Sequence, residues 1–474
     1  MELSYVNASG RYEIESSQKQ VSNNGRDIIS DLPNHIIGSI LSFLPTKVAV
    51  RTCVLSKRWK NLWTFVRELS FQDHFHRIKI KKMQFVQFVY RVLRHLDSSM
   101  IDSFSLSLCY NYAHIKEWIS LVLSRKVKKV YLEAQSKHQY QEFPTKKKKE
   151  FPTNSLFECQ YLQELCLKNF RIRLRPFITL SSLTVLKLSR MSVTTTFGVP
   201  NEPKDLTLNF PVLRKFETEG WPWYHVKSVT LQMPLLDVLS MDDCRYHGPH
   251  VEINYCVSHL IKFNYTGRFL SATILVDAVD IVSANINIML YDGSSNSIQE
   301  QMVFVSKLLS INGLNAASLK LCLSREQLFE SVVEVFEKVR DSLNYIPDFQ
   351  ILSHLHLDLA PGDLLLGILS KSPCLETLVL KVQDFGKTLL DSALLPGCFL
   401  LTLKVVKFER FAATTHDLNF AEFVLKNAVV LEKITFSCSP PKKLGQKKWK
   451  KVRDNILSYT RRFNSLDIKL EIVP

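Results

Sequence analysis

Residues 31–63 read DLPNHIIGSILSFLPTKVAVRTCVLSKRWKNLW, and this stretch decides how the chain begins to fold. Apolar residues recur in it every three or four positions, which is the spacing of one face of a helix. They are Leu32, Ile36, Ile40, Leu41 and Leu44. Pro33 suits a first helical turn, because its missing N–H would be unpaired there, and Asp31 can cap that end. Pro45 ends the helix, and two more short helices are predicted, capped by Thr46 and Ser56.

Three short helices in about 40 residues are too few to enclose a core of their own. Their apolar side chains, which include Trp59, Leu62 and Trp63, must therefore pack on something else. One possibility is a partner protein, because aromatic residues are common anchors of protein interfaces. The other is the domain that follows in the same chain. Periodicity alone favours neither possibility.

The stretch also carries a long set of characteristic residues. They are Leu32-Pro33, Ile36-Ile37, Ile40 to Lys47, Ala49 to Thr52, Val54 to Trp59 and Leu62-Trp63. In these residues the chain resembles the F-box of plant proteins. The resemblance implies docking on a Skp-family adaptor held by a cullin, in an SCF ubiquitin ligase whose target the chain selects. The residues that it places at the adaptor are Leu32, Pro33, Ile36, Ile40, Leu41, Leu44, Pro45, Val54, Leu55 and Trp59.

Beyond residue 126 an apolar pattern recurs along the chain. Each unit has an apolar residue, two variable residues, an apolar residue, one variable residue and a third apolar residue. The units begin at Leu162, Leu183, Leu213, Leu236, Leu260, Leu375, Leu403 and Leu431. Where they follow one another most closely they lie 21 to 24 residues apart, a period typical of leucine-rich repeats. The gap of 30 residues between Leu183 and Leu213 predicts an inserted loop.

One such unit cannot bury its apolar face alone, so stacked units are expected to form a curved solenoid with a concave parallel sheet. The pattern weakens between about residues 273 and 352, where strands around Ile286 and Leu319 lack the full signature. The number of repeats in that region stays open. The predicted fold class is α/β: a small all-helical F-box, an irregular leucine-rich-repeat horseshoe of parallel strands, and a strand–helix–strand segment at the end.

The C-terminal segment reads as a strand, a loop, a helix and a strand. Asn419 and Glu422 have capping-box spacing, which predicts the start of that helix. The segment resembles the FBD domain of plant F-box proteins, and the whole chain resembles the F-box/FBD/LRR-repeat family. The expected divisions are a disordered polar tail at 1–27, the F-box at 28–72, connecting helices and a first repeat at 73–125, leucine-rich repeats at 126–394 and the FBD domain at 395–470.

The composition limits where the chain works and what it binds. A formal charge of +16 permits acidic or nucleic-acid partners, although net charge says nothing of fold. The lysine runs at 146–149 and 442–451 are weak nuclear-localisation motifs. No apolar h-region or membrane span of about 18 residues is present, so we expect no membrane contact and a nuclear or cytoplasmic location. Ten cysteines without a C-x-x-C pair favour reduced, mostly buried thiols.

Motifs for catalysis are missing from the sequence. No G-x-x-x-x-G-K, G-x-G-x-x-G or G-x-S-x-G occurs, so we expect neither an enzyme nor a cofactor. The group most suggestive of a metal is Asp242, Asp243, Cys244, His247 and His250, but zinc sites normally have tighter paired spacing, so a solvated loop is expected. His354 and His356 lie on one face of a predicted strand and are expected at the surface or in the core.

Three functional hypotheses remain open. The first is a non-catalytic receptor subunit that binds an adaptor and a target protein whose identity the sequence does not give. The second is a protein-binding repeat scaffold without a ligase role, since Asn34-His35 and Val48 stand where the F-box usually has acidic residues. The third is nucleic-acid binding, which would weaken steeply with salt and is the least favoured.

Overall fold

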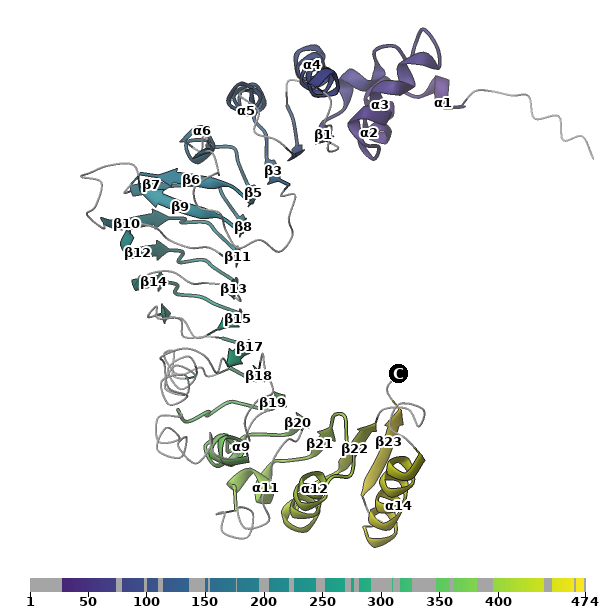
Figure 1. The fold of residues 1–474 in the computed structure, drawn as a ribbon, viewed down its shortest axis with the longest axis vertical. Coiled ribbons are helices and arrows are strands. Elements are labelled where there is room, and N and C mark those ends of the chain that lie inside the picture. Colours follow the sequence, from purple (N-terminus) through teal and green to yellow (C-terminus); the bar gives the residue numbers. More distant parts are fainter. Residues whose placement is uncertain are drawn as a thin grey trace, which may run out of the picture.

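The computed structural model describes residues 28–73, 79–97, 100–109, 114–135, 150–151, 154–175, 177–195, 204–220, 226–243, 252–268, 274–276, 281–290, 309, 316–325, 347–358, 362–381, 395–438, 446–463 and 466–472. Within these ranges the chain forms an open arc, with a helical module at its N-terminal end (Figure 1). A parallel sheet of 15 strands lines the inner side of the arc. The predicted fold class, helices followed by a parallel-strand solenoid, is confirmed.

The strands of the inner sheet lie side by side in the order of the sequence. They are β1 (Glu68–Gln72), β2 (Ser103–Leu108), β3 (Lys129–Ala134), β5 (Glu164–Lys168), β8 (Val185–Ser189), β11 (Lys215–Glu219), β13 (Val238–Asp243), β15 (Lys262–Arg268), β17 (Ser283–Leu290), β18 (Ser318–Arg325), β19 (His354–Asp358), β20 (Thr377–Lys381), β21 (Val405–Phe408), β22 (Lys433–Cys438) and β23 (Asp467–Ile472). Successive side chains point to opposite faces, so Phe104 and Leu106 of β2 are buried while the serines between them face the concave side.

Backbone hydrogen bonds at one rim of the arc fix the register between repeats. The carbonyl oxygen of Gln163 accepts from the N–H groups of both Thr184 and Val185, at 2.8 and 3.0 Å. The carbonyls that repeat this double acceptance further along the chain are those of Thr184, Arg214, Asp237, Ile261, Ala317, Ser353, Glu376 and Lys404. Because this contact recurs just before successive strands, these strands start at the same level as their neighbours.

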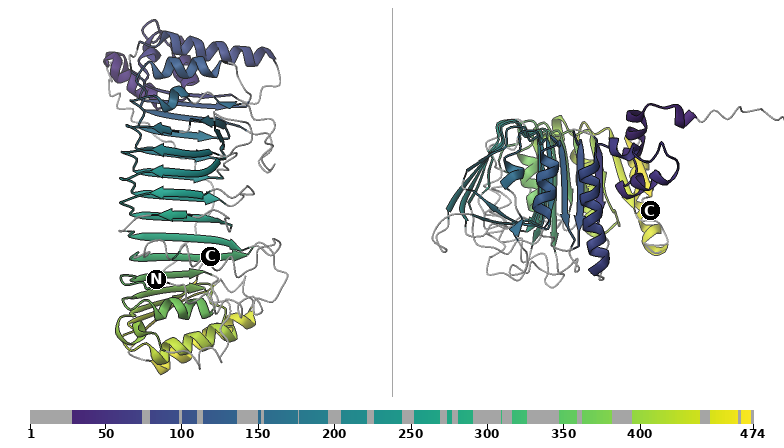
Figure 2. Two further views of the ribbon diagram at one scale, coloured as in Figure 1. Left: turned by 90° about the vertical axis from the view of Figure 1, so that its left-hand side faces the viewer. Right: turned by 90° about the horizontal axis from the view of Figure 1, so that it is seen from above.

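Helices cover the two ends of the sheet on its outer side (Figures 1 and 2). The first strands are covered by α4 (Lys79–His95), α5 (Ile115–Leu123) and α6 (Asn154–Phe157), and the last by α9 (Gly362–Ser370), α11 (Gly397–Leu401), α12 (Thr415–Asn427) and α14 (Gln446–Arg462). A helix is about 10 Å wide and a strand spacing is about 4.8 Å, so packed helices spread the outer side and bend the sheet.

In the middle of the arc, short parallel strands take the place of the helices. One sheet holds β7 (Phe177–Thr179), β10 (Lys204–Asn209), β12 (Val226–Gln232), β14 (Glu252–Cys256) and β16 (Ile274–Val276), and another holds β4 (Glu150–Phe151), β6 (Arg171–Leu174) and β9 (Ser192–Thr195). The outer and inner strands have the same spacing, and the arc is accordingly straighter here than at its ends (Figure 1).

The stretch in which the repeat signature weakens still belongs to the inner sheet. β17 pairs with β15 on one side and β18 on the other, and β18 pairs with β19, all in parallel. Their buried residues Ile286, Leu319 and Leu355 occupy the same face as the leucines of the regular units. The solenoid is therefore continuous through this region among the described strands.

Helix α4 begins at Lys79, after strand β1. One predicted detail of the helices is wrong. The capping box of α12 is formed by Thr414 and Asp417, because the helix starts at Thr415, and not by Asn419 and Glu422. The Asp417 carboxylate accepts the backbone N–H groups of Thr414 and Ala412, both at 3.0 Å.

The C-terminal segment continues the sheet and closes it with aromatic side chains. The rings of Phe408 and Phe436, on adjacent strands, are stacked at 5.2 Å, and Phe411 lies 4.7 Å from Phe436. Tyr459 of α14 covers the same ring at 6.1 Å. Helix α14 and strand β23 thus extend the predicted strand–helix–strand segment by one more unit.

The cysteines are less buried than expected. Of those in the described ranges, all of which are free thiols, Cys398 and Cys438 are buried, whereas Cys256 and Cys374 are exposed. Cys166 and Cys322 lie on strands at positions that face the concave side, where packing is incomplete. Within the same ranges, no helix is long and apolar enough to cross a lipid bilayer.

Candidate functional site

The N-terminal module is built from short helices, with boundaries slightly different from those predicted. They are α1 (Ile28–Asp31), α2 (Asn34–Ser42), α3 (Thr46–Arg51), η1 (Thr52–Val54) and η2 (Leu62–Phe65). Pro33 and Pro45 are the N-cap residues of α2 and α3, without side-chain caps, so Pro33 lies just before the first turn and Thr46 just inside it. Ser56 accepts the N–H of Trp59 at 3.4 Å, but a turn and η2 follow instead of an α-helix.

One side of this module packs on the repeats. Ile37, Gly38 and Leu41 of α2 are buried, as are Leu62 and Val66 further along. They join the same continuous core as the first strands of the sheet. The module is too small to enclose a core of its own, and its buried apolar residues instead share the core of the following domain. This is one of the two possibilities that the sequence left open.

The opposite side is apolar and exposed. Phe43 is 90% exposed and Val54 is 82% exposed, the two highest values among the large apolar residues of the described ranges. The exposed apolar residues of this side, named here the apolar face, are Ile36, Ile40, Phe43, Leu44, Val48, Val54 and Leu55. So many exposed apolar side chains in one small module are characteristic of a protein interaction site, because leaving them in water is unfavourable.

Most residues predicted to contact an adaptor lie on the outside of the module. Those that are exposed are Pro33, Ile36, Ile40, Leu44, Pro45, Val54 and Leu55, and Leu32 and Trp59 are half-buried. Leu41 is only 2% exposed and packs in the core, so in this structure it offers no surface to a partner. Phe43 and Val48 are exposed on the apolar face but are absent from the predicted set, although Phe43 follows Ile36 and Ile40 at helical spacing. Adaptor contact itself stays a prediction.

Polar contacts close the module on itself. The Arg58 guanidinium donates to the carbonyl oxygen of Leu32 and, at 3.5 Å, to Oδ1 of Asn34. The Trp63 indole donates to the carbonyl of Lys60 at 3.1 Å. The end of the module is thus held against its beginning. Asn34, which replaces an acidic residue, still accepts a hydrogen bond there.

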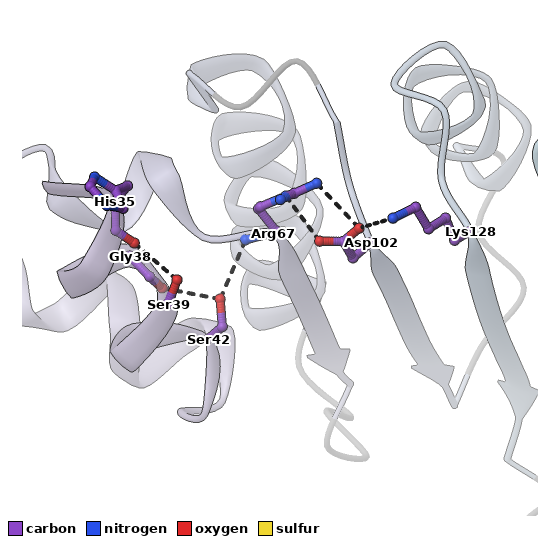
Figure 3. Close-up of polar contacts among 7 residues, drawn as sticks. All are labelled: His35, Gly38, Ser39, Ser42, Arg67, Asp102 and Lys128. Atoms are coloured by element: carbon purple, nitrogen blue, oxygen red, sulfur yellow. Dashed lines mark hydrogen bonds and ion pairs between the residues drawn. The ribbon is translucent and has the colours of Figure 1, made fainter.

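Further contacts hold the module to the first repeats (Figure 3). Ser42 donates to the carbonyl of Gly38 at 3.1 Å and accepts the N–H of Arg67 at 3.4 Å. The Arg67 guanidinium pairs with Asp102 at 2.9 Å, and Lys128 pairs with the same carboxylate at 3.0 Å. These contacts link α2 to the residues that immediately precede β1, β2 and β3. It orients the apolar face relative to the solenoid.

Helix α3 also protects the free edge of the inner sheet. Strand β1 is the first strand, and only one of its edges pairs with β2. Thr46, which is buried, accepts the N–H of Ser70 from the other edge at 2.7 Å. An open strand edge otherwise invites pairing with other chains. The module is therefore the N-terminal cap of the solenoid as well as the carrier of the apolar face.

Gly38 allows the close approach of α2 to η2. A Cβ at this position would lie 2.7 Å from Cβ and 3.0 Å from the carbonyl oxygen of Phe65. We expect Gly38→Ala to force the two elements apart and to destabilise the N-terminal end by about 1–3 kcal/mol, as overpacking does. Hydrogen exchange of residues 28–73 would measure it. Gly397→Ala, where a Cβ would meet nothing within 4 Å, is the matched control, and equal effects of the two variants would contradict the account.

The concave side of the sheet is a second candidate surface, and its charges are paired across strands. Lys129 pairs with Glu164 at 2.7 Å, and Lys187 with Glu217 at 2.7 Å. Further pairs on this side join Lys168 to Glu133, Lys381 to Asp358 and Lys407 to Glu471. Among the described strands, the concave side is thus polar, and many of its lysines are already paired with carboxylates, whereas a nucleic-acid groove would need lysines free to contact phosphates.

These contacts shift the pKa values of the groups on the concave side. Burial opposes ionisation of Glu164, but hydrogen bonds from Lys129 and Tyr131 outweigh it and lower its pKa. Burial and the hydrogen bond to Glu164 raise the pKa of Tyr131 to about 12. Glu164 is therefore charged and Tyr131 neutral at neutral pH, so the pair presents a fixed pattern of charge and hydrogen bonding to a partner.

We expect His356 to make the stability of the repeats depend on pH. It lies on β19, on the same face as His354 as predicted, 3.4 Å from Glu409. Burial lowers its pKa below the ordinary 6.5, although Glu409 opposes this. The unfolded chain therefore binds this proton more readily, and we expect stability to fall as the pH drops below about 6.5. Urea unfolding at pH 7.5 and 5.5 measures the fall. His356→Gln should reduce it, and an unchanged fall would exclude His356 as its source.

The structure brings no metal site together in the part of the chain that it describes. Asp242 and Asp243 end strand β13, and the remaining members of the group considered in the sequence, Cys244, His247 and His250, lie outside the described residues. The lysine run at 146–149 lies outside them too. The candidate sites are accordingly the apolar face and the concave side of the sheet.

A helical cap with an exposed apolar face, packed on a parallel-strand solenoid, defines a repeat protein of the leucine-rich type with a small helical module at its N-terminal end. Comparison with known proteins agrees. The F-box domain model matches residues 29–70 and the FBD model matches residues 392–436. The F-box match covers α1 to β1, and the FBD match covers α11 to β22.

Whole-chain similarity extends the match. The chain is 26% identical to one F-box/FBD/LRR-repeat protein of Arabidopsis thaliana, over 89% of this chain and 91% of that protein, and 27% identical to another, over 87% and 92%. It is 30% identical to a putative FBD-associated F-box protein of the same plant, over 55% and 60%. The chain thus carries an F-box and an FBD domain and is related over most of its length to F-box/FBD/LRR-repeat proteins, which confirms the resemblance stated from the sequence.

Proposed function

We propose that this chain is the substrate-recognition subunit of an SCF-type ubiquitin ligase. In this proposal the F-box docks on a Skp-family adaptor, which joins it to a cullin, and the repeats hold a target protein. The observation that carries the proposal is the apolar face, which stays exposed although other apolar residues of the same module, such as Ile37, Leu41 and Leu62, are buried against the repeats. A surface that is costly to expose fits a partner that covers it.

The solenoid would supply the second binding surface. Its concave side offers fixed charges and hydrogen-bonding groups over many strands, which suits recognition of a folded protein or a segment of one. No catalytic residue is required of this chain, because holding a lysine of the target near a charged ubiquitin raises its effective concentration. The contacts between α2 and β3 would keep the two surfaces at a constant separation. We place this activity in the nucleus, the cytoplasm or both.

The test is a binding assay between the purified full-length chain and a panel of Skp-family adaptors. A one-to-one complex by size-exclusion chromatography with light scattering, which binds cullin when cullin is added, would support the proposal. Failure to bind any adaptor, with the chain folded by circular dichroism, would overturn it. The chain would then be a repeat scaffold whose F-box serves only as the cap of the sheet.

A further inference from the structure

Helix α14 is strongly basic. The helix carries seven lysines and arginines and one acidic residue, Asp454, so it accounts for +6 of the formal +16. Helix α4 is also basic, with five lysines and arginines and no acidic residue. On the concave side, by contrast, several lysines pair with carboxylates of other strands. No described part of the concave side rivals α14 as a positive surface.

The two faces of α14 have opposite character. Val452, Ile456 and Tyr459 are buried and pack on the last strands of the sheet. On the opposite face Lys450, Arg453 and Leu457 are exposed, at spacings of three and four residues that put them in one stripe. Because α14 covers the outer side of the sheet, this stripe points away from the concave side (Figure 1).

Leu457 indicates what kind of partner the stripe fits. It is 46% exposed, and it lies among basic side chains instead of in the core. A phosphate backbone would gain nothing from a leucine, because nucleic-acid contacts outside the bases are made to charged phosphates and sugars. An acidic polypeptide with one apolar side chain would satisfy both the charges and the leucine.

We propose that the outer face of α14 is a binding site for an acidic segment of a partner protein. Lys450 and Arg453 pair with carboxylates of the segment, and Leu457 covers an apolar side chain between them. The site lies at the opposite end of the arc from the F-box (Figure 1). It is independent of adaptor docking, so the chain can bind the acidic segment whether or not the F-box is occupied.

The test measures binding of a fluorescein-labelled peptide to the full-length chain by anisotropy. The peptide has about eight residues, enough to follow the helix in extended form, all aspartate or glutamate except a central leucine. We expect Lys450→Glu with Arg453→Glu to weaken binding at least about tenfold. Lys81→Glu with Arg91→Glu on α4 changes the net charge equally at two exposed positions, and should alter binding less than about twofold.

Two further sets of variants separate the effect of the charges from that of Leu457. Lys450→Arg with Arg453→Lys retains the charges and should retain binding. Leu457→Ala should weaken binding of the leucine peptide but not of the same peptide with alanine at its centre, and this arm stands even if the charge-reversal variant fails to fold. The proposal is overturned if both charge-reversal variants lose binding equally, if neither does, or if duplex DNA of the same charge binds more tightly than the peptide.

Discussion

Replacing both Ile40 and Phe43 by aspartate is expected to abolish adaptor binding. Both side chains lie on the apolar face and are exposed in the isolated chain, so the replacement removes nothing from the core. Each loses about 1.5–3 kcal/mol of apolar burial in the complex, and each carboxylate must also be desolvated there. A combined cost above about 4 kcal/mol lowers affinity at least about a thousandfold. Isothermal titration calorimetry with the adaptor measures the loss.

The matched control replaces two exposed apolar residues of the repeats, Leu235 and Val282, by aspartate. It adds the same charge at sites remote from the F-box and should leave adaptor affinity unchanged. Adaptor binding by the Ile40 and Phe43 variant with the strength of the unmodified chain would show that the apolar face is not the docking surface. The melting temperature of each variant identifies any loss caused by unfolding.

The inner sheet could be predicted from the sequence because its constraint is local and repeated. A buried first leucine, such as Leu236, followed by Leu239 and Met241, must face the core whatever the rest of the unit does. The outer layer is under no such constraint. Helix α5 and strand β12 occupy equivalent places, and either can cover the same apolar side chains. The sequence pattern therefore predicted the strands of the solenoid but not which segments cross outside it.

The apolar face was predicted only in part, for a geometrical reason. The face of α2 that meets the repeats and the face that meets solvent are both apolar, so Leu41 and Phe43 look alike in the sequence. Only the packing of Gly38 against Phe65 decides that Leu41 turns inward. Similarly, the ion pair of Lys129 with Glu164 joins residues 35 positions apart. The length of the segment between them decides which carboxylate lies beside Lys129, and periodicity does not reveal that length.

Phe436→Ala is expected to unfold the C-terminal end of the solenoid while leaving the F-box intact. Phe436 is completely buried, and its ring contacts Phe408 and Phe411 at 5.2 and 4.7 Å and Tyr459 at 6.1 Å. Truncating such a ring costs about 3–5 kcal/mol. In a repeat array each unit contacts only its neighbours, so the loss is greatest at β21 to β23 and declines with distance along the sheet. Hydrogen exchange resolved along the chain measures this.

The outcome decides whether the FBD segment is the last part of the solenoid or an independent domain. Because β21, β22 and β23 pair in the same sheet as β20, we expect fast exchange to spread from β22 into β20 and to fade toward β17. A separate domain would lose protection as one block that stops at β21. Leu400→Ala, an exposed change on α11 in the same segment, should leave exchange unaltered. Adaptor affinity should survive Phe436→Ala, since the apolar face is held only by the first strands.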